Sequence, residues 1–194
     1  NLGTPETTAE SSGDKDASLS NRARSMGTVL HRTLKQLANE GVEKWPESRI
    51  QQLPTTWAAQ LKELGMLARP DELKSLLEAV SSMLADKRGR WILQHHEQAQ
   101  CEQALGYRYS DRGHMGTSVI DRTFIDDGTR WIIDYKLSQP AEDESEAQFS
   151  QRQSSAYSAQ LSHYAKLYRS MQPNPVRCAL YFPQIPMFIE LEAE

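Results

Sequence analysis

Two aspartates flank a predicted β-hairpin at positions that would bring their side chains together. Asp121 follows the apolar pair Val119-Ile120, Asp134 follows Ile132-Ile133, and Asp127-Gly128 lies between the two runs. An Asp-Gly pair between two strand-like apolar segments is a strong hairpin signal. If Asp127 and Gly128 are the two turn residues, Asp121 pairs directly with Asp134. Both side chains then lie on one face of the sheet, with their Cβ atoms about 5 Å apart.

Lys136 lies two residues after Asp134, so the alternation of a strand places it on the same face. Two neighbouring carboxylates in a partly apolar setting repel each other, at a cost of several kcal/mol unless they are protonated or share a cation. One ammonium group does not neutralise both. A divalent ion does, and oxygen ligands favour Mg²⁺ or Mn²⁺ over zinc. The hairpin therefore indicates a metal site, and a surface hairpin with solvated charges is the alternative.

The elements that must position this hairpin fall into a helical half and a half that contains the sheet. Apolar residues recur at helical spacing in three segments of the first half, at about 20–41, 55–68 and 70–86. Short segments rich in β-branched and aromatic residues predict strands at 100–110, 116–126, 129–138, 176–182 and 187–192. A polar linker at 141–152 and a helix at 153–171 separate the third strand from the fourth. This order predicts an α/β or α+β domain whose sheet carries helices, with a helical N-terminal half.

Composition limits the class of protein. The chain has 194 residues, of which 38% are hydrophobic and 25% charged, and its net charge is −4. This length suits one domain, and no run of about 18 apolar residues occurs that could form a transmembrane helix. Acidic residues concentrate in 1–20 and 141–147, while the rest of the chain has a small excess of basic residues. We expect 1–20 to be a flexible acidic tether and 21–194 to form the domain, with its helical part at 21–97 and its sheet at 98–194.

The cysteine content and the N-terminal sequence indicate a reducing compartment. Cys101 and Cys178 are the only cysteines, too few for a disulfide framework, a four-cysteine zinc site or an iron–sulfur cluster. Residues 1–20 lack the apolar core of a signal peptide. The chain begins with Asn1 instead of methionine, which suggests a processed start or a segment of a longer polypeptide. We therefore expect a cytoplasmic protein.

The order Asp121, then Asp134-x-Lys136 on the next strand, resembles the signature of the PD-(D/E)XK nucleases, with Ile120 where the proline of that name would stand. More specifically, Ile120-Asp121-Arg122 together with Asp134-Tyr135-Lys136 resembles the nuclease domain of the RecB family.

Two further motifs flank the hairpin in the order of that family. Residues 27–31, which begin with Gly27 and end with His31, resemble its G-x-x-x-H helix, whose histidine is a metal ligand. Residues 160–164, from Gln160 to Tyr164, resemble its Q-x-x-x-Y motif. A single helical histidine is more often structural, and core packing explains Tyr164 about as well as a substrate contact does. Four motifs in order are more specific than any one of them.

The resemblance implies a restriction-endonuclease-like mixed sheet flanked by helices, and hydrolysis of DNA phosphodiester bonds with Mg²⁺ or Mn²⁺. The implied metal ligands are His31, Asp121, Asp134 and the backbone carbonyl of Tyr135. Lys136 would orient the attacking water or stabilise the transition state, which makes Asp121, Asp134 and Lys136 the implied catalytic set.

Further residues have implied secondary roles. The expected substrate contacts are Gln160, Tyr164, Arg122 and Arg32, and Arg22, Arg24 and Lys35 are candidate phosphate contacts. Glu102, on the strand before the hairpin, is a second acid that could bind the metal through water. Gly27 costs helix stability relative to alanine, so the close approach of another chain or a ligand would explain it.

The family resemblance also implies a setting. Such domains commonly form the C-terminal exonuclease of UvrD-like helicases, as in the AddA type, and act in DNA repair and recombination near the nucleoid of the bacterial cytoplasm. The helicase portion would deliver single-stranded DNA ends to the domain. Two other functions stay open on the sequence alone. One is a nuclease-derived DNA-binding or docking module without activity, and the other is a metal-dependent hydrolase of a smaller substrate.

Overall fold

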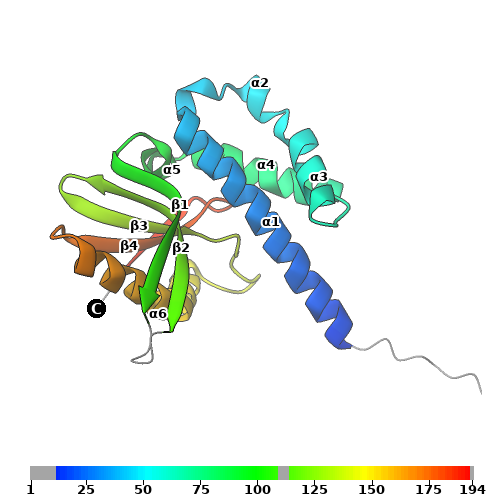
Figure 1. Ribbon diagram of the computed structural model, residues 1–194. Helices are drawn as coiled ribbons and strands as arrows, with labels where there is room; N and C mark the ends of the chain where they lie inside the picture. The colour runs from blue at the N-terminus through cyan, green and yellow to red at the C-terminus, as the bar shows by residue number, and fades with distance from the viewer. Residues whose placement is uncertain (1–11, 109–113, 193–194) are drawn as a thin grey trace, which may run out of the picture.

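A five-stranded sheet lies between two groups of helices (Figure 1). The computed structural model describes residues 12–108 and 114–192. The elements are α1 (Ser12–Glu40), η1 (Val42–Lys44), α2 (Glu47–Ile50), α3 (Leu53–Glu63), α4 (Pro70–Ala85), α5 (Lys87–Leu93), β1 (Glu97–Arg108), β2 (Met115–Asp126), β3 (Thr129–Tyr135), α6 (Glu146–Met171), β4 (Val176–Phe182) and β5 (Met187–Leu191). This order confirms the predicted mixed sheet with flanking helices and a helical N-terminal half. In the part of the chain that the structure describes, no helix is long and apolar enough to cross a bilayer.

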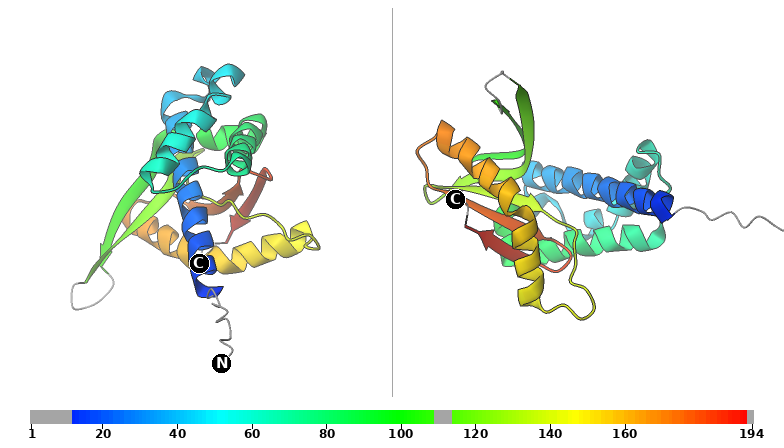
Figure 2. Two further views of the ribbon diagram at one scale, coloured as in Figure 1. Left: turned by 90° about the vertical axis from the view of Figure 1, so that its right-hand side faces the viewer. Right: turned by 90° about the horizontal axis from the view of Figure 1, so that it is seen from below.

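The strands follow the order β1-β2-β3-β4-β5 across the sheet. Strands β3 and β4 are parallel, and the other neighbours are antiparallel. A parallel pair needs a crossover, which α6 supplies as it passes over one face of the sheet. Helices α1 to α5 lie on the other face, as the views in Figure 2 show. The predicted hairpin therefore has helices on both sides.

The hairpin turn forms as the sequence predicts. Asp127 and Gly128 have φ angles of 46° and 69°, the left-handed values that a type I′ turn requires. Asp126 pairs with Thr129, and the pairing continues in the predicted register as far as Arg122 and Ile133. The expected next pair, Asp121 with Asp134, is not part of the ladder.

At this point the same face of β2 stops facing the N-terminal helices and begins to face α6, and β1 changes in the same way. Glu102, which the register of the neighbouring pairs places opposite Asp121, has a left-handed φ of 51°. Phe124 packs with the N-terminal helices, whereas Ile120 packs with α6. In a regular strand these two side chains, four residues apart, would share a face. Asp121 therefore lies where β2 turns from one helical layer to the other.

Several predicted boundaries were wrong. Helix α1 begins at Ser12, so residues 12–20 of the predicted tether are helical, and residues 1–11 lie outside the described part of the chain. Helix α6 begins at Glu146, inside the predicted linker, because the Ser145 hydroxyl and the Gln148 side chain form a reciprocal capping box. Strand β3 ends at Tyr135 instead of residue 138. The short elements η1, α2 and α5 were not predicted, because segments of so few residues show no clear hydrophobic periodicity.

Helix α5 anchors the base of the hairpin through a close approach to β4. A Cβ atom on Gly89 would lie 2.3 Å from the carbonyl oxygen of Met83 and 2.6 Å from the hydroxyl of Tyr181. The α5 carbonyl of Ile92, at 3.0 Å, and the following carbonyl of Gln94, at 2.9 Å, accept hydrogen bonds from Arg122 of β2. The absence of a side chain at Gly89 thus lets α5 pack where it can hold β2.

We predict that Gly89→Ala lowers the free energy of unfolding by about 1–3 kcal/mol, because the backbone of Met83 must move to make room. Urea denaturation measures this change. The control is Gly106→Ala on β1, where an added Cβ would meet no described heavy atom within 4 Å. An equal loss of stability in both variants would contradict the proposed packing constraint.

Candidate active site

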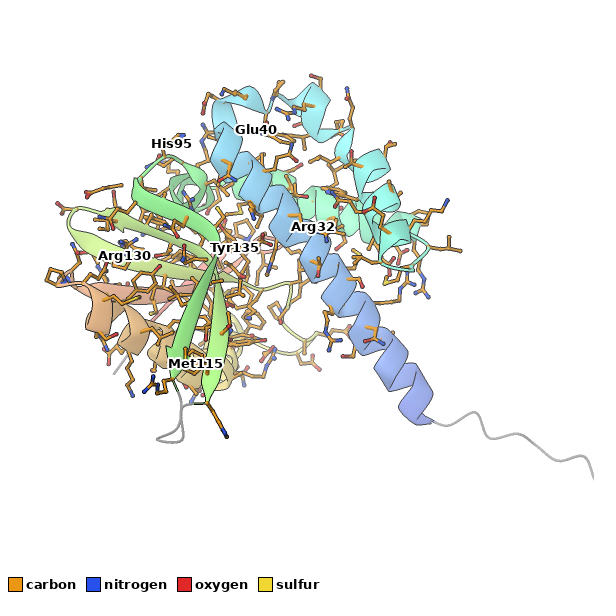
Figure 3. All side chains as sticks on the ribbon, in the orientation of Figure 1. Arg32, Glu40, His95, Met115, Arg130 and Tyr135 are labelled. Atoms are coloured by element: carbon orange, nitrogen blue, oxygen red, sulfur yellow. The ribbon has the colours of Figure 1, made fainter. Side chains whose placement is uncertain are left out.

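Asp121 is held by groups from two other elements. Its Oδ1 lies 3.3 Å from Nδ1 of His31 on α1, and its Oδ2 accepts a hydrogen bond of 2.9 Å from the backbone N–H of Tyr135. Tyr135 lies where the sheet meets α1 (Figure 3), and its ring centroid is 5.9 Å from that of His31. The structure thus brings His31 to the hairpin although about 90 residues separate them in the sequence.

Asp134 is the more deeply buried of the two acids, with 3% of its surface exposed. The ammonium nitrogen of Lys136 lies 2.6 Å from its Oδ2, and the side-chain amide of Gln160 donates a hydrogen bond of 3.4 Å to its Oδ1. Lys136 therefore shares a face with Asp134, as the strand alternation predicts. The same ammonium lies 4.1 Å from the ring centroid of Tyr157 on α6, a cation–π contact.

The charges of these side chains act on one another. Burial, and then the negative charge of Asp134, raise the pKa of Asp121 from its ordinary 3.8 to about 6, against the opposing effects of His31, the Tyr135 N–H and Lys136. Burial works to lower the pKa of Lys136, but the carboxylate of Asp134 outweighs it and the net pKa is raised, so the side chain is a cation at neutral pH. A single ammonium leaves the two-carboxylate site short of positive charge.

A cavity of about 820 Å³ opens beside these groups. Helix α1 forms one wall with Ala23, Arg24, Gly27, Thr28 and His31. The other walls come from Glu102 of β1, from residues 135–138 at the end of β3, and from Tyr157 of α6. Four of the candidate functional residues, Arg24, His31, Glu102 and Lys136, therefore line one open space.

A family model of the PD-(D/E)XK nuclease superfamily matches residues 3–191, nearly the whole chain. The chain belongs to this superfamily. No curated protein sequence matches it.

Two solved structures are similar to the chain. A protein from Eubacterium rectale, provisionally described as an exonuclease, is 14% identical over 82% of this chain and 59% of its own length, with a TM-score of 0.46. A protein from Vibrio cholerae is 12% identical over 84% of this chain and 43% of its own length, with a TM-score of 0.31. This chain thus spans less than two thirds of either structure.

PD-(D/E)XK nucleases generally use divalent metal ions, and the donors at this site suit such an ion. They are two carboxylates, of which Asp121 has a pKa raised by burial and by the charge of Asp134, together with the imidazole of His31. Within residues 12–108 and 114–192, no three or more His, Cys, Asp or Glu side chains are already arranged at the spacing of a complete metal site. Binding an ion would therefore need the side chains around Asp121 and Asp134 to be rearranged.

Gln160 and Tyr164, two of the expected substrate contacts, make their contacts within the protein. The Gln160 amide donates a hydrogen bond of 2.8 Å to the Tyr164 hydroxyl, which in turn donates one of 3.1 Å to the carbonyl of Val119. Tyr164 is 6% exposed, and neither residue is among the described lining of the cavity. Their geometry supports a role in holding Asp134 and β2 more than the expected contact with substrate.

The basic residues that were expected to contact DNA lie at different places in the structure. Arg122 is 2% exposed and donates to α5 carbonyls, which does not support a substrate contact. Arg22 pairs with Glu72 of α4, whereas Arg24 lines the cavity. Arg32 is exposed on α1 (Figure 3) but is not among the described lining residues.

Glu102 lines the cavity, as a second acid of the site would, but its carboxylate is paired with Lys35 at 2.6 Å. Lys35 lies one turn after His31 on α1. Sequence reasoning missed Tyr157, because its position on the apolar stripe of α6 is typical of a packing residue. Its position three residues before Gln160, on the helix that faces Asp134, was the available signal.

We predict that metal-free Asp121→Asn is more stable than the wild type at pH 7.5, by about 1–3 kcal/mol. Between about pH 4 and 6 the unfolded chain loses the proton of Asp121 while the folded chain keeps it, so rising pH destabilises the wild type. Asp121→Asn lacks this pH-dependent loss of stability, and the two proteins should be equally stable near pH 4. Urea denaturation across this range in EDTA measures the difference.

Adding Mg²⁺ or Mn²⁺ should raise the melting temperature of the wild type, since the ion relieves the same repulsion, and should leave Asp121→Asn nearly unchanged. Identical pH profiles for the two proteins would show that the Asp121 carboxylate is not under electrostatic strain.

Proposed function

We propose that this chain is a metal-dependent deoxyribonuclease domain of the RecB type, an exonuclease that hydrolyses phosphodiester bonds. The observation that carries the proposal is the convergence of His31 and Asp121 with the pair Asp134 and Lys136, from α1 and two strands, beside one open cavity. Superfamily membership gives the reaction class, and this arrangement of charge supports an active domain over one that only binds DNA.

His31, Asp121, Asp134 and the backbone carbonyl of Tyr135 would hold the ion, and the oxygen donors favour Mg²⁺ or Mn²⁺. When bound, such an ion lowers the pKa of a water molecule and neutralises charge on the scissile phosphate. The backbone N–H of Tyr135 and the imidazole of His31 orient the Asp121 carboxylate. Gln160 and Lys136 hold the two oxygens of Asp134.

Lys136 supplies the fixed positive charge of the reaction. Its raised pKa keeps the ammonium protonated, so it can stabilise the negative charge that grows on the phosphate oxygens or orient the attacking water. Because the ammonium is already held between Asp134 and the ring of Tyr157, little reorganisation is needed when that charge develops. We assign Lys136 to transition-state stabilisation and not to proton transfer.

We further propose that the domain acts on single-stranded DNA ends that a UvrD-like helicase portion of the same polypeptide or complex delivers, as in the AddA type. Repair and recombination in the bacterial cytoplasm are the corresponding processes. The support is the four-motif resemblance to RecB-family domains, and the modest basic character of the cavity walls, since a helicase that holds the strand leaves this domain little need for a large basic surface of its own.

We predict that Lys136→Ala lowers kcat by at least about 10²-fold, the usual scale for loss of one preorganised electrostatic donor, with little change in the affinity for DNA. Digestion of end-labelled single- and double-stranded DNA in Mg²⁺ measures the rate. Lys166→Ala, which removes an exposed lysine of α6, is the matched control and should cleave like the wild type.

Asp134→Asn should also abolish cleavage, but by weakening the metal site, so excess Mn²⁺ should restore part of the rate. If the wild-type protein, alone or joined to its helicase, binds DNA but does not cleave it in Mg²⁺ or Mn²⁺, the nuclease proposal fails and the domain is a binding module. Unchanged cleavage by Lys136→Ala would make the lysine a structural partner of Asp134 only.

A further inference from the structure

Gly27 lies inside α1, where glycine is unfavourable. A glycine in a helix interior costs stability relative to alanine, so its presence there calls for a reason. Packing does not provide one, because a Cβ atom built on Gly27 meets no described heavy atom within 4 Å. Gly89 behaves in the opposite way, since its Cβ would meet a backbone oxygen at 2.3 Å. Nothing in the described fold therefore requires Gly27 to lack a side chain.

The open space over Gly27 is the candidate active-site cavity. Gly27 lies one turn before His31, and both residues line the cavity together with Thr28. Lys136 and Tyr157 line the same cavity from the end of β3 and from α6. A side chain at position 27 would project from α1 beside the groups proposed to carry the reaction.

We propose that Gly27 determines substrate access, because the bare surface of α1 lets the sugar–phosphate backbone of a single DNA strand lie against the helix beside His31. The proposal rests on the proposed function, which it deepens by naming how the strand approaches. Close contact between a nucleic acid backbone and a protein backbone needs the absence of a Cβ atom, which Gly27 provides at no cost to packing.

The other walls of the cavity favour a single strand as the occupant. Binding of single-stranded nucleic acid combines cationic side chains along the backbone with aromatic rings on the bases. Arg24 supplies a cation, and the half-buried ring of Tyr157 supplies an aromatic surface. The hydroxyl of Ser138 adds a neutral phosphate donor to the lining.

The test replaces Gly27 by alanine and by leucine, both good helix formers, in the full chain. Asn39→Ala and Asn39→Leu are the matched controls, because Asn39 is exposed near the other end of α1. The probe is a fluorescent oligothymidylate, whose affinity is measured by anisotropy in Ca²⁺ on a Lys136→Ala background that keeps the strand intact. Cleavage kinetics in Mg²⁺ are measured on the unmodified background.

Gly27→Ala and Gly27→Leu should melt at the same temperature as the wild type or higher, because both residues favour the helix. Gly27→Leu should weaken oligothymidylate binding by at least about tenfold, with a smaller loss for Gly27→Ala, since an added side chain excludes the strand sterically. In cleavage, KM should rise more than kcat falls. The Mn²⁺-induced rise in melting temperature should stay unchanged, and so should all properties of the Asn39 variants.

Wild-type affinity in Gly27→Leu would overturn the inference. If the protein binds a blunt duplex more tightly than the single strand, and Gly27→Leu weakens binding of the duplex only, the choice of a single strand as substrate is wrong. If the wild type binds the strand but does not cleave it, the nuclease proposal fails, while a selective loss of binding in Gly27→Leu still supports the access role. Failure of the wild type to bind either DNA would overturn both proposals.

Discussion

The repulsion between two carboxylates in a buried part of the sheet is the constraint around which the site is built. Asp121 and Asp134 lie close enough for the charge of one to raise the pKa of the other. The polar groups that contact them offset part of this repulsion, namely the His31 imidazole, the Tyr135 N–H, the Lys136 ammonium and the Gln160 amide. These contacts fix the carboxylates in place without cancelling their charge. The remaining negative potential is what a divalent cation would satisfy.

Holding both acids at one place depends on the irregular point in the sheet. If β2 kept a regular alternation past Arg122, Ile120 would face the N-terminal helices instead of α6. The left-handed conformation of Glu102 on β1 accompanies the change of face on β2. As a result Asp121 can contact α1 while Ile120, on one side of it, packs with α6 and Arg122, on the other side, bonds to α5. The strain of one left-handed residue is thus located at the site itself.

The two helical layers contribute different parts of the site. Helix α1, packed on the N-terminal side, supplies His31 and the open wall of the cavity around Gly27. Helix α6, packed on the other side, supplies Gln160 and Tyr157, which hold Asp134 and Lys136. Because the sheet lies between the two helical layers, side chains from both layers contact the two acids. The site therefore exists only when both layers are docked on the sheet.

The features that depend on neighbouring residues could be predicted from the sequence. The Asp127-Gly128 turn, the register up to Arg122, the shared face of Asp134 and Lys136, and most of the helices and strands follow from turn chemistry and periodicity, which act over a few residues. The motif residues also indicated the superfamily before the fold was known. Long-range packing, in contrast, brings His31 to Asp121, directs Arg122 into the interior towards α5, and joins Gln160 and Tyr164 to protein groups. These outcomes depend on which face each strand presents after the bend at Asp121, and that is set by the packing of two helical layers from opposite sides, which no local pattern encodes.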